Sequence, residues 1–267
     1  MNSGIINIIA NKNKDSQITM RKLTRLLEEK GYSVPREYRA QADLNICIGG
    51  DGAFLRAVHK TSFPTVPFVG INTGHLGFFQ EIRKNDLELF VDNYHKGDYT
   101  LERINLMECH VYTKDREFHL HSLNEFVVRN RSSQVVHLSV DIAEKHLQDF
   151  SGDGLIISSS AGSTAYNYSA GGAILYPTLD GYQLTPLAPL NTKAYRSLYN
   201  SIVVPNDTVM DIYPERRYQS SLLVISDGME LSFKQIRRLR FDIAERYIQR
   251  LLFDKNYYWT NLKDKFL

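Results

Sequence analysis

The spacing of apolar residues changes near residue 100, and this change limits the folds open to the chain. Before it, short apolar runs alternate with segments whose apolar residues recur every three or four positions, as in strands followed by helices. After it, short apolar runs follow one another, and residues 136–142 alternate apolar and polar side chains along a strand. The pattern predicts an α/β domain over residues 1–100 and an all-β, sandwich-like domain over residues 101–253.

The last segment, residues 254–267, carries Tyr257, Tyr258, Trp259 and Phe266 among charged residues. So many aromatic side chains in a short tail need an apolar surface that removes them from water. We expect the tail to return to the N-terminal domain and to pack there.

Composition narrows the class of protein. Of the 267 residues, 43% are hydrophobic and 23% are charged, which is typical of a globular protein. The net charge of +2 is too small to indicate binding to nucleic acid or to an anionic membrane surface. Cys47 and Cys109 lie in apolar runs and are predicted to be buried, reduced thiols, as in a cytoplasmic protein. No apolar stretch approaches the roughly 20 residues that cross a bilayer, so we expect no membrane partner.

A glycine-rich turn follows the apolar run at residues 43–48 and precedes a helical pattern. It reads Gly49-Gly50-Asp51-Gly52. Glycines here let the backbone approach a phosphate group closely, so that its N–H groups can donate hydrogen bonds. Open α/β sheets bind ligands at this end of their strands. Asp51 would then accept a proton or hold a metal ion, although a tight turn in which Asp51 caps the helix is an equally open alternative.

Small hydroxyl residues and glycines are concentrated in a second segment, residues 158–172, which follows Gly152-Asp153-Gly154 and an apolar run. The segment can supply many short hydrogen-bond donors and acceptors, and its tyrosines offer a flat face to a base. A disordered serine-rich linker is the alternative. The apolar runs on both sides of the segment argue against it.

Asn124 and Glu125 begin another apolar run. An amide beside a carboxylate can bind the two neighbouring hydroxyls of a ribose, although such a pair is also common where a loop meets a strand. The eight histidines show no spacing typical of a zinc site, so His119 and His121 are interpreted as the exposed face of a strand.

Taken in order, these motifs resemble those of the NAD kinase family, in its bacterial ATP-dependent form. They are Gly-Gly-Asp-Gly at 49–52, Asn-Thr-Gly-His-Leu-Gly-Phe at 72–78, Asn-Glu at 124–125, Gly-Asp-Gly at 152–154 and Gly-Ser-Thr-Ala-Tyr at 162–166. The likeness runs from about residue 43 to 205 and continues through residues 226–228. It implies an α/β N-terminal domain, a β-sandwich C-terminal domain and phosphorylation of the adenosine ribose of NAD at its 2′-hydroxyl by ATP.

The resemblance also implies roles for single residues. Asp51 matches the family's catalytic base, Phe78 matches an aromatic residue that lies against the adenine, and Asn124 and Glu125 match residues that hold the riboses and phosphates. The other positions that match substrate-binding residues of the family are Gly50, Gly52, Ser151, Asp153, Ala161, Thr164, Ala165, Tyr166, Ser169 and Ala188.

Members of the family are homodimers or homotetramers that use a divalent cation, usually Mg²⁺, with ATP. Tyr195 matches a position where they meet a neighbouring subunit close to the site. The chain departs from the family pattern at Ala53, where threonine is usual, and at Ser151, where many bacterial members have arginine or another large polar residue. It also departs at residues 159–161, where Thr-Pro-Thr becomes Ser-Ser-Ala. These departures bear on affinity and on the choice of donor, with polyphosphate open beside ATP, rather than on the reaction.

Two other functions fit parts of the pattern. A lipid kinase of the diacylglycerol or sphingosine type shares the Gly-Gly-Asp-Gly turn. The sequence Ala53-Phe54-Leu55 after that turn and the loop at residues 72–77 argue against it. A non-catalytic dinucleotide sensor would tolerate Ala53, but the presence of Asp51 favours an enzyme.

Overall fold

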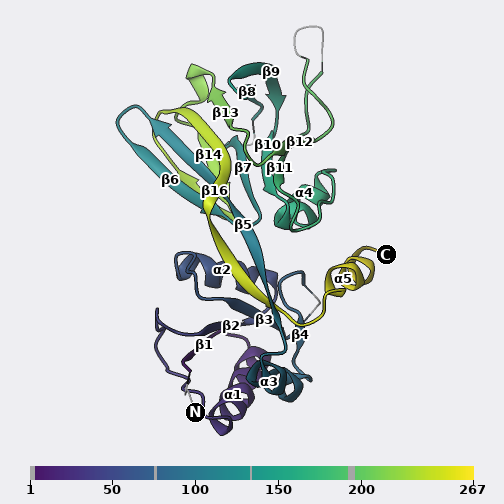
Figure 1. The fold of residues 1–267 in the computed structure, drawn as a ribbon. Helices are drawn as coiled ribbons and strands as arrows, with labels where there is room; N and C mark the ends of the chain where they lie inside the picture. Colours follow the sequence, from purple (N-terminus) through teal and green to yellow (C-terminus); the bar gives the residue numbers. More distant parts are fainter. Residues whose placement is uncertain (1–3, 75–76, 133, 192–195) are drawn as a thin grey trace. The chain divides into compact units, whose positions relative to one another are not determined.

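The computed structural model describes residues 4–74, 77–132, 134–191 and 196–267. The chain divides into two compact units, one made of residues 1–103 and 247–267 and the other of residues 104–246 (Figure 1). Two long strands, β5 (Thr100–Thr113) and β16 (Ile236–Leu252), contribute residues to both units.

The first unit has a parallel sheet with helices packed on it. Ile8 pairs with Ile46 and Cys47 pairs with Gly70, and the end of β16 adds Arg250 beside Phe68, again in parallel. The strands are β1 (Ile6–Ala10), β2 (Leu44–Gly49), β3 (Phe68–Asn72) and β4 (Ile82–Arg83), and the helices are α1 (Lys14–Glu29), α2 (Asp51–Lys60), α3 (Leu87–Lys96) and α5 (Tyr257–Phe266).

Local sequence signals account for the ends of these helices. The Asn13 side chain accepts a hydrogen bond from the N–H of Ser16 and so caps the start of α1. Gly97 ends α3 in the left-handed conformation with φ of 78°, which glycine adopts without strain. Leu23 and Leu27 are one turn apart on α1 and are fully buried in the core of this unit.

The second unit is built almost entirely of antiparallel strands. One group consists of β5 with β6 (Glu117–Ser122), β8 (Val136–Ile142), β9 (Lys145–Gly152), β13 (Met210–Pro214) and β16. The other is a six-stranded sheet in the order β12 (Ile202–Pro205), β11 (Gly181–Leu187), β10 (Gly154–Ser159), β7 (Glu125–Asn130), β14 (Leu222–Ser226) and β15 (Met229–Ser232). Short helical turns lie at Ala161–Thr164 (η1), Tyr166–Ser169 (α4) and Arg216–Tyr218 (η2).

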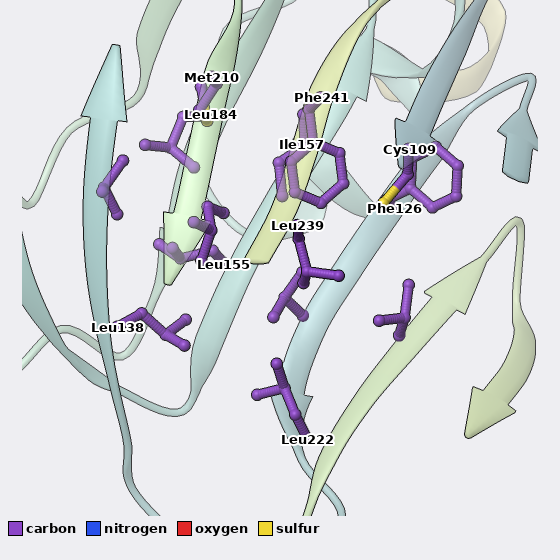
Figure 2. Close-up of a cluster of buried hydrophobic side chains, with 14 of the residues drawn as sticks. Cys109, Phe126, Leu138, Leu155, Ile157, Leu184, Met210, Leu222, Leu239 and Phe241 are labelled. Atoms are coloured by element: carbon purple, nitrogen blue, oxygen red, sulfur yellow. The ribbon is translucent and has the colours of Figure 1, made fainter. Parts of the chain in front are cut away.

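Alternate residues of both strand groups form one apolar core (Figure 2). Phe126 and Ile157 belong to the six-stranded sheet, and Leu239 and Phe241 belong to β16; all four are fully buried. The rings of Phe126 and Phe241 lie 5.7 Å apart between centroids. The prediction of an α/β part followed by an all-β, sandwich-like part is therefore confirmed.

Cys47 and Cys109 are free and buried, and burial raises the pKa of both thiols. Among the described residues, no helix is long and apolar enough to cross a membrane.

Candidate functional site

The turn at residues 49–52 places Asp51 at the first position of α2. Gly49 ends β2 with φ of 152°, and a Cβ atom there would lie only 2.7 Å from the Cβ of Ala53. A larger residue would therefore push β2 away from α2. Asp51 is thus held at the carboxyl end of a buried parallel strand, where α/β sheets bind their ligands.

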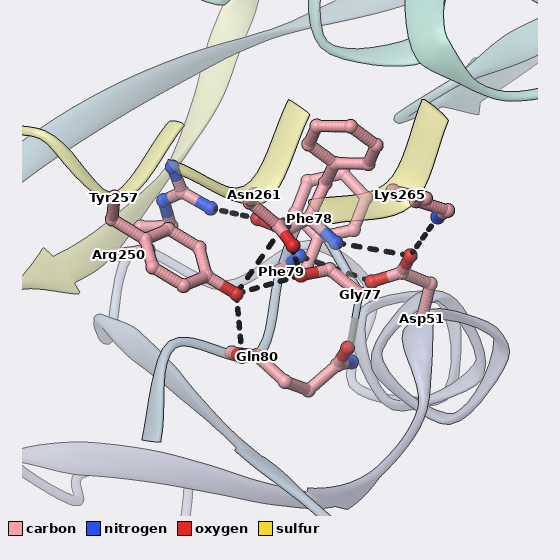
Figure 3. A network of polar contacts seen from close by, with 9 residues as sticks. All are labelled: Asp51, Gly77, Phe78, Phe79, Gln80, Arg250, Tyr257, Asn261 and Lys265. Carbon is pink, nitrogen blue, oxygen red and sulfur yellow. Dashed lines mark hydrogen bonds and ion pairs between the residues drawn. The ribbon is translucent and has the colours of Figure 1, made fainter. Parts of the chain in front are cut away.

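The Asp51 carboxylate is held by three donors (Figure 3). Its two oxygens accept hydrogen bonds from the backbone N–H groups of Phe78, at 3.1 Å, and Phe79, at 3.0 Å. The ammonium group of Lys265 lies 3.4 Å from Oδ2. Gly77 makes this approach possible, because a Cβ there would overlap Asp51 Oδ1. The carboxylate is therefore oriented before any substrate binds, yet its side chain keeps 27% of its exposure.

The C-terminal segment supports the loop that contacts Asp51 (Figure 3). The Tyr257 hydroxyl lies 2.6 Å from the carbonyl oxygens of Gly77 and Gln80, and the Asn261 amide also donates to Gly77 O at 2.6 Å. Arg250 is almost fully buried and donates to Phe78 O at 2.6 Å. The sequence predicted that the aromatic tail would pack on this part of the chain, but it did not identify these polar contacts.

Phe78, predicted to lie against the adenine, is only 8% exposed. The rings of Tyr258 and Phe266 are each 5.9 Å from its ring, and the Lys265 ammonium lies 4.6 Å from its centroid. The side chains of α5 therefore cover the Phe78 ring in this structure.

A hollow of about 370 Å³ opens beside the start of α2 and the end of β1. Three cationic side chains, Lys12, Arg56 and Lys60, line it, and none of the described residues that line it is acidic. The Arg56 guanidinium reaches the glycine turn, since its Nη1 lies 3.4 Å from where a Cβ of Gly52 would be. A Cβ atom at Gly50 would meet open space. This hollow is suited to a polyanion.

In the second unit, Asp227 holds the segment that carries Asn124 and Glu125. Its carboxylate accepts hydrogen bonds from Ser122 Oγ at 2.6 Å and from the N–H groups of Leu123, Asn124 and Glu125 at 2.7, 2.7 and 3.2 Å. Asp227 lies in the turn between β14 and β15 with φ of 47°. Its role was not identified from the sequence, because the two segments are about a hundred residues apart.

Asn124 and Glu125 both present buried oxygens that no described protein group satisfies. These atoms are Asn124 Oδ1 and Glu125 Oε2. Burial, and then the charge of Asp227, raise the pKa of Glu125 to about 8, while a hydrogen bond from the Tyr166 backbone lowers it. Buried acceptors without donors are costly, so the pair is suited to a ligand that brings hydroxyl groups.

The serine-rich segment is ordered around this pair. Ser159 Oγ donates to Leu123 O at 2.6 Å and accepts from the Gly162 N–H at 3.0 Å. Gly162 has no room for a side chain, because a Cβ would overlap the backbone of Asn124. Thr164 is buried there, Ala161 and Ala165 are half-buried, and Ser169 is exposed.

Three predicted residues, Asp153, Tyr166 and Ala188, line a hollow of about 270 Å³ in the second unit. Arg129 also lines it, and the Arg129 Nε atom is buried without a hydrogen-bond partner among the described residues. An unpaired guanidinium donor at the wall of a hollow points to an acceptor on a ligand. Nothing in the sequence distinguished Arg129 from other strand residues.

Ser151, also predicted to bind substrate, is 1% exposed. Its hydroxyl lies 2.7 Å from His137 Nδ1, and its N–H donates to Ser197 Oγ at 3.1 Å. The structure therefore places this side chain in internal contacts. The Tyr195 prediction lies outside the described residues.

Comparisons with known proteins identify the same family in both parts of the chain. Residues 33–99 match the family described as "ATP-NAD kinase N-terminal domain" and residues 123–249 match "ATP-NAD kinase C-terminal domain". The NAD kinase of Finegoldia magna is 46% identical over 270 residues, covering 100% of this chain and 99% of its own length. The NAD kinase of Streptococcus pneumoniae is 33% identical, covering 98% of this chain and 96% of its own.

Two solved structures share the fold. Yeast NADH kinase complexed with NADH has a TM-score of 0.83 at 18% identity, covering 98% of this chain and 87% of its own. An NAD kinase from Archaeoglobus fulgidus in complex with ATP has a TM-score of 0.78 at 19% identity, covering 97% of this chain and 98% of its own.

Proposed function

This chain belongs to the NAD kinase family, and we propose that Asp51 is the base of its reaction. The enzyme is a phosphotransferase that moves the γ-phosphoryl group of ATP to the 2′-hydroxyl of the adenosine ribose of NAD, which yields NADP and ADP. The similar proteins support neither a lipid kinase nor a non-catalytic sensor.

One observation carries the assignment of Asp51. Its carboxylate stands at the carboxyl end of β2, is oriented by the N–H groups of Phe78 and Phe79, and remains partly accessible. A base fixed in this way can accept the proton of the ribose hydroxyl as its oxygen attacks the γ-phosphorus, and general-base catalysis contributes about 10²- to 10⁴-fold. An assay of NADP formed from NAD and Mg–ATP tests the reaction, and substitution of Asp51 tests the role.

The acceptor is proposed to bind in the second unit. Asn124 Oδ1 and Glu125 Oε2 would accept hydrogen bonds from ribose hydroxyls, which would satisfy both buried oxygens. Asp153, Tyr166 and Ala188 would line the space for another part of the dinucleotide, with Arg129 Nε as a donor to it. Ala161, Thr164, Ala165 and Ser169 would complete this side of the site from the serine-rich segment.

The donor phosphates are proposed to bind in the hollow beside α2. Lys12, Arg56 and Lys60 supply positive charge there, and the N-terminal end of α2 supplies backbone N–H groups next to Gly50 and Gly52. The magnesium ion would enter as part of the Mg–ATP substrate, held mainly by phosphate oxygens. The cationic lining of the hollow fits an ion carried by the phosphates better than an ion held by a protein cage.

Replacing Arg56 with alanine should raise the KM for ATP about fivefold, since the loss of one partly exposed charge contact costs roughly 1 kcal/mol. The KM for NAD should stay unchanged. Steady-state kinetics with each substrate varied in turn measure both constants. The control is Arg21→Ala, which removes an exposed arginine from α1. An unchanged KM for ATP, or an equal rise in both constants, would exclude Arg56 from the donor site.

We further propose that the chain forms homo-oligomers through the edge strand β12 and that it works in the cytoplasm. β12 lies at one end of the six-stranded sheet, and Val203 on it and Tyr199 before it are 47% and 64% exposed. Unpaired sheet edges with exposed apolar side chains favour association between chains. The two free, buried thiols support a reducing compartment.

Val203→Lys should shift the molar mass of the protein in solution towards that of a single chain, because it places a charge in the proposed contact. Light scattering and activity on one dilution series measure the mass and the effect of assembly together. Glu230→Lys, an exposed change on the opposite edge strand β15, is the control. An unchanged mass for Val203→Lys would show that β12 is not the interface.

A further inference from the structure

One face of the β5–β6 hairpin gathers three histidines and two carboxylates. In the antiparallel register, His110 is opposite His119 and Glu108 is opposite His121. Side chains alternate along each strand, so these four residues and Glu117 lie on the same face. The face is partly accessible, since the side chains of Glu108, His110 and His121 keep about a fifth of their exposure and those of Glu117 and His119 about half.

Three of these side chains are spaced as metal ligands. Glu108 Oε1 lies 3.4 Å from His110 Nε2 and 3.5 Å from His119 Nδ1. One ligand atom from each of the three residues lies within 4.8 Å of the others. Tetrahedral ligands about 2.0–2.1 Å from a zinc ion are separated from one another by roughly 3.3 Å. Small side-chain movements would therefore let one ion reach all three.

Glu117 contacts the opposite edges of the same two rings. Its Oε1 lies 3.1 Å from His110 Nδ1 and 3.4 Å from His119 Nε2. A histidine that binds a metal through one nitrogen usually donates the N–H of its other nitrogen to a carboxylate, which fixes its tautomer. Glu117 occupies this orienting position for both rings.

Neutral rings of His110 and His119 have too few N–H groups to donate to every carboxylate oxygen that faces them. A neutral imidazole has a single N–H, yet each nitrogen of His110 and of His119 faces a carboxylate oxygen. The two ring centroids are 4.2 Å apart, and one nitrogen of each ring lies beside the same Glu108 oxygen. A cation between Glu108 and the rings would satisfy the inner nitrogens and leave one N–H on each ring for Glu117.

A further carboxylate lies on β16, the strand that pairs with β5. Asp242 on β16 has a buried oxygen, Oδ1, with no hydrogen-bond partner among the described residues. β16 pairs with β5, and Cys109 and Phe241 belong to the apolar core, so Asp242 lies on the same face of the sheet as Glu108 and His110. The neighbouring guanidinium of Arg240 is already paired with Asp211 at 3.1 and 3.0 Å. A cation, or a water bound to one, on this face of the sheet would satisfy the carboxylate oxygen of Asp242.

We propose that Glu108, His110 and His119 bind one zinc ion or a similar divalent transition-metal ion, with Glu117 orienting both histidines. Two imidazoles and a carboxylate suit zinc, whereas Mg²⁺ prefers oxygen ligands alone. The site would be separate from the Mg–ATP substrate, and it would link the two strands of the hairpin. His121, whose Nε2 lies 3.8 Å from Glu108 Oε1, is the side chain that could complete the coordination.

Zinc binding to the untagged, full-length protein after chelator treatment tests this site. Equilibrium dialysis should give one zinc ion per chain, bound zinc should raise the melting temperature, and Mg²⁺ should not displace it. Co²⁺ in place of zinc should show the visible absorption of a tetrahedral site with nitrogen ligands. The double variant His110→Ala/His119→Ala should lose the zinc, the absorption and the rise in melting temperature.

Two further variants distinguish zinc binding at this site from non-specific zinc binding by surface histidines. Glu117→Gln keeps all three ligands and should weaken zinc binding by about 10- to 100-fold. His146→Ala is the control, because His146 also lies beside two carboxylates, Asp141 and Asp149, but on the β8–β9 hairpin. Absence of stoichiometric zinc in the folded wild-type protein would overturn the proposal. So would a loss of binding in His146→Ala equal to that in the double variant.

Discussion

Asp51→Asn should reduce kcat by about 10²- to 10⁴-fold while leaving folding and NAD binding nearly unchanged. The asparagine keeps the size of the side chain and one oxygen that can accept from Phe78 or Phe79, so the turn before α2 should persist. What is lost is the group that takes the proton. Steady-state rates of NADP formation, together with calorimetric titration of NAD, separate the two effects.

Asp98→Asn provides the control for this substitution. Asp98 is exposed in the same unit, after the end of α3, and the change removes the same charge. Its kcat should match that of the wild-type enzyme. If Asp51→Asn turned over nearly as fast as the wild type, Asp51 would not be the base, although the family assignment would stand.

Asn124→Ala and Glu125→Gln should each weaken NAD binding by about 1–3 kcal/mol, or roughly 5- to 150-fold in Kd. Each variant removes or alters an acceptor that a ribose hydroxyl would satisfy in a nearly dry environment. Equilibrium titration with NAD measures the change. Glu144→Gln, an exposed change in the turn between β8 and β9, should bind NAD normally.

The raised pKa of Glu125 predicts that NAD binding is coupled to the release of a proton. With a folded-state pKa of about 8 against an ordinary value of 4.5, Glu125 holds its proton near pH 7 in the free protein. Hydroxyl donors from the ribose favour the ionised form, so NAD binding near pH 7 should release a proton. Calorimetry in buffers of different ionisation enthalpy detects the release, which Glu125→Gln should abolish. A heat of binding that is the same in all buffers would contradict the ribose assignment.

The same shift predicts how stability changes with pH. The unfolded chain loses the Glu125 proton near pH 4.5, whereas the folded chain keeps it until about pH 8. The folded state binds more protons in this interval, so the contribution of Glu125 to stability is fully present below pH 4.5 and is lost as the pH rises to 8. Above pH 8 the Glu125→Gln variant should therefore melt at a higher temperature than the wild type.

The predictions that succeeded from sequence alone rest on local features. Strand and helix periodicities depend on neighbouring residues, so the α/β part and the β-rich part were both predicted correctly. The glycine turn at residues 49–52 was also predicted from the sequence, because the close approach of Gly49 to Ala53 involves residues only four positions apart. The family was identified from the order of motifs, which is a property of the sequence itself.

Tertiary structure decided which distant residues support or complete these motifs. Lys265 contacts Asp51, and the Tyr257 hydroxyl donates to the carbonyl oxygen of Gly77. Asp227 accepts a hydrogen bond from the backbone N–H of Glu125. No periodicity connects residues that are a hundred or two hundred positions apart, so only the folded chain shows these contacts.

Side-chain direction was equally hidden from the sequence. The order of motifs predicts that Ser151 binds substrate, but its hydroxyl contacts His137, the residue opposite it in the β8–β9 pair. His110 and His119 have no zinc-like spacing along the chain, yet the register of β5 and β6 places them opposite each other. Strand register is set by the packing of a whole sheet. The sequence by itself therefore determined the elements and the reaction, and the tertiary structure decided which side chains meet.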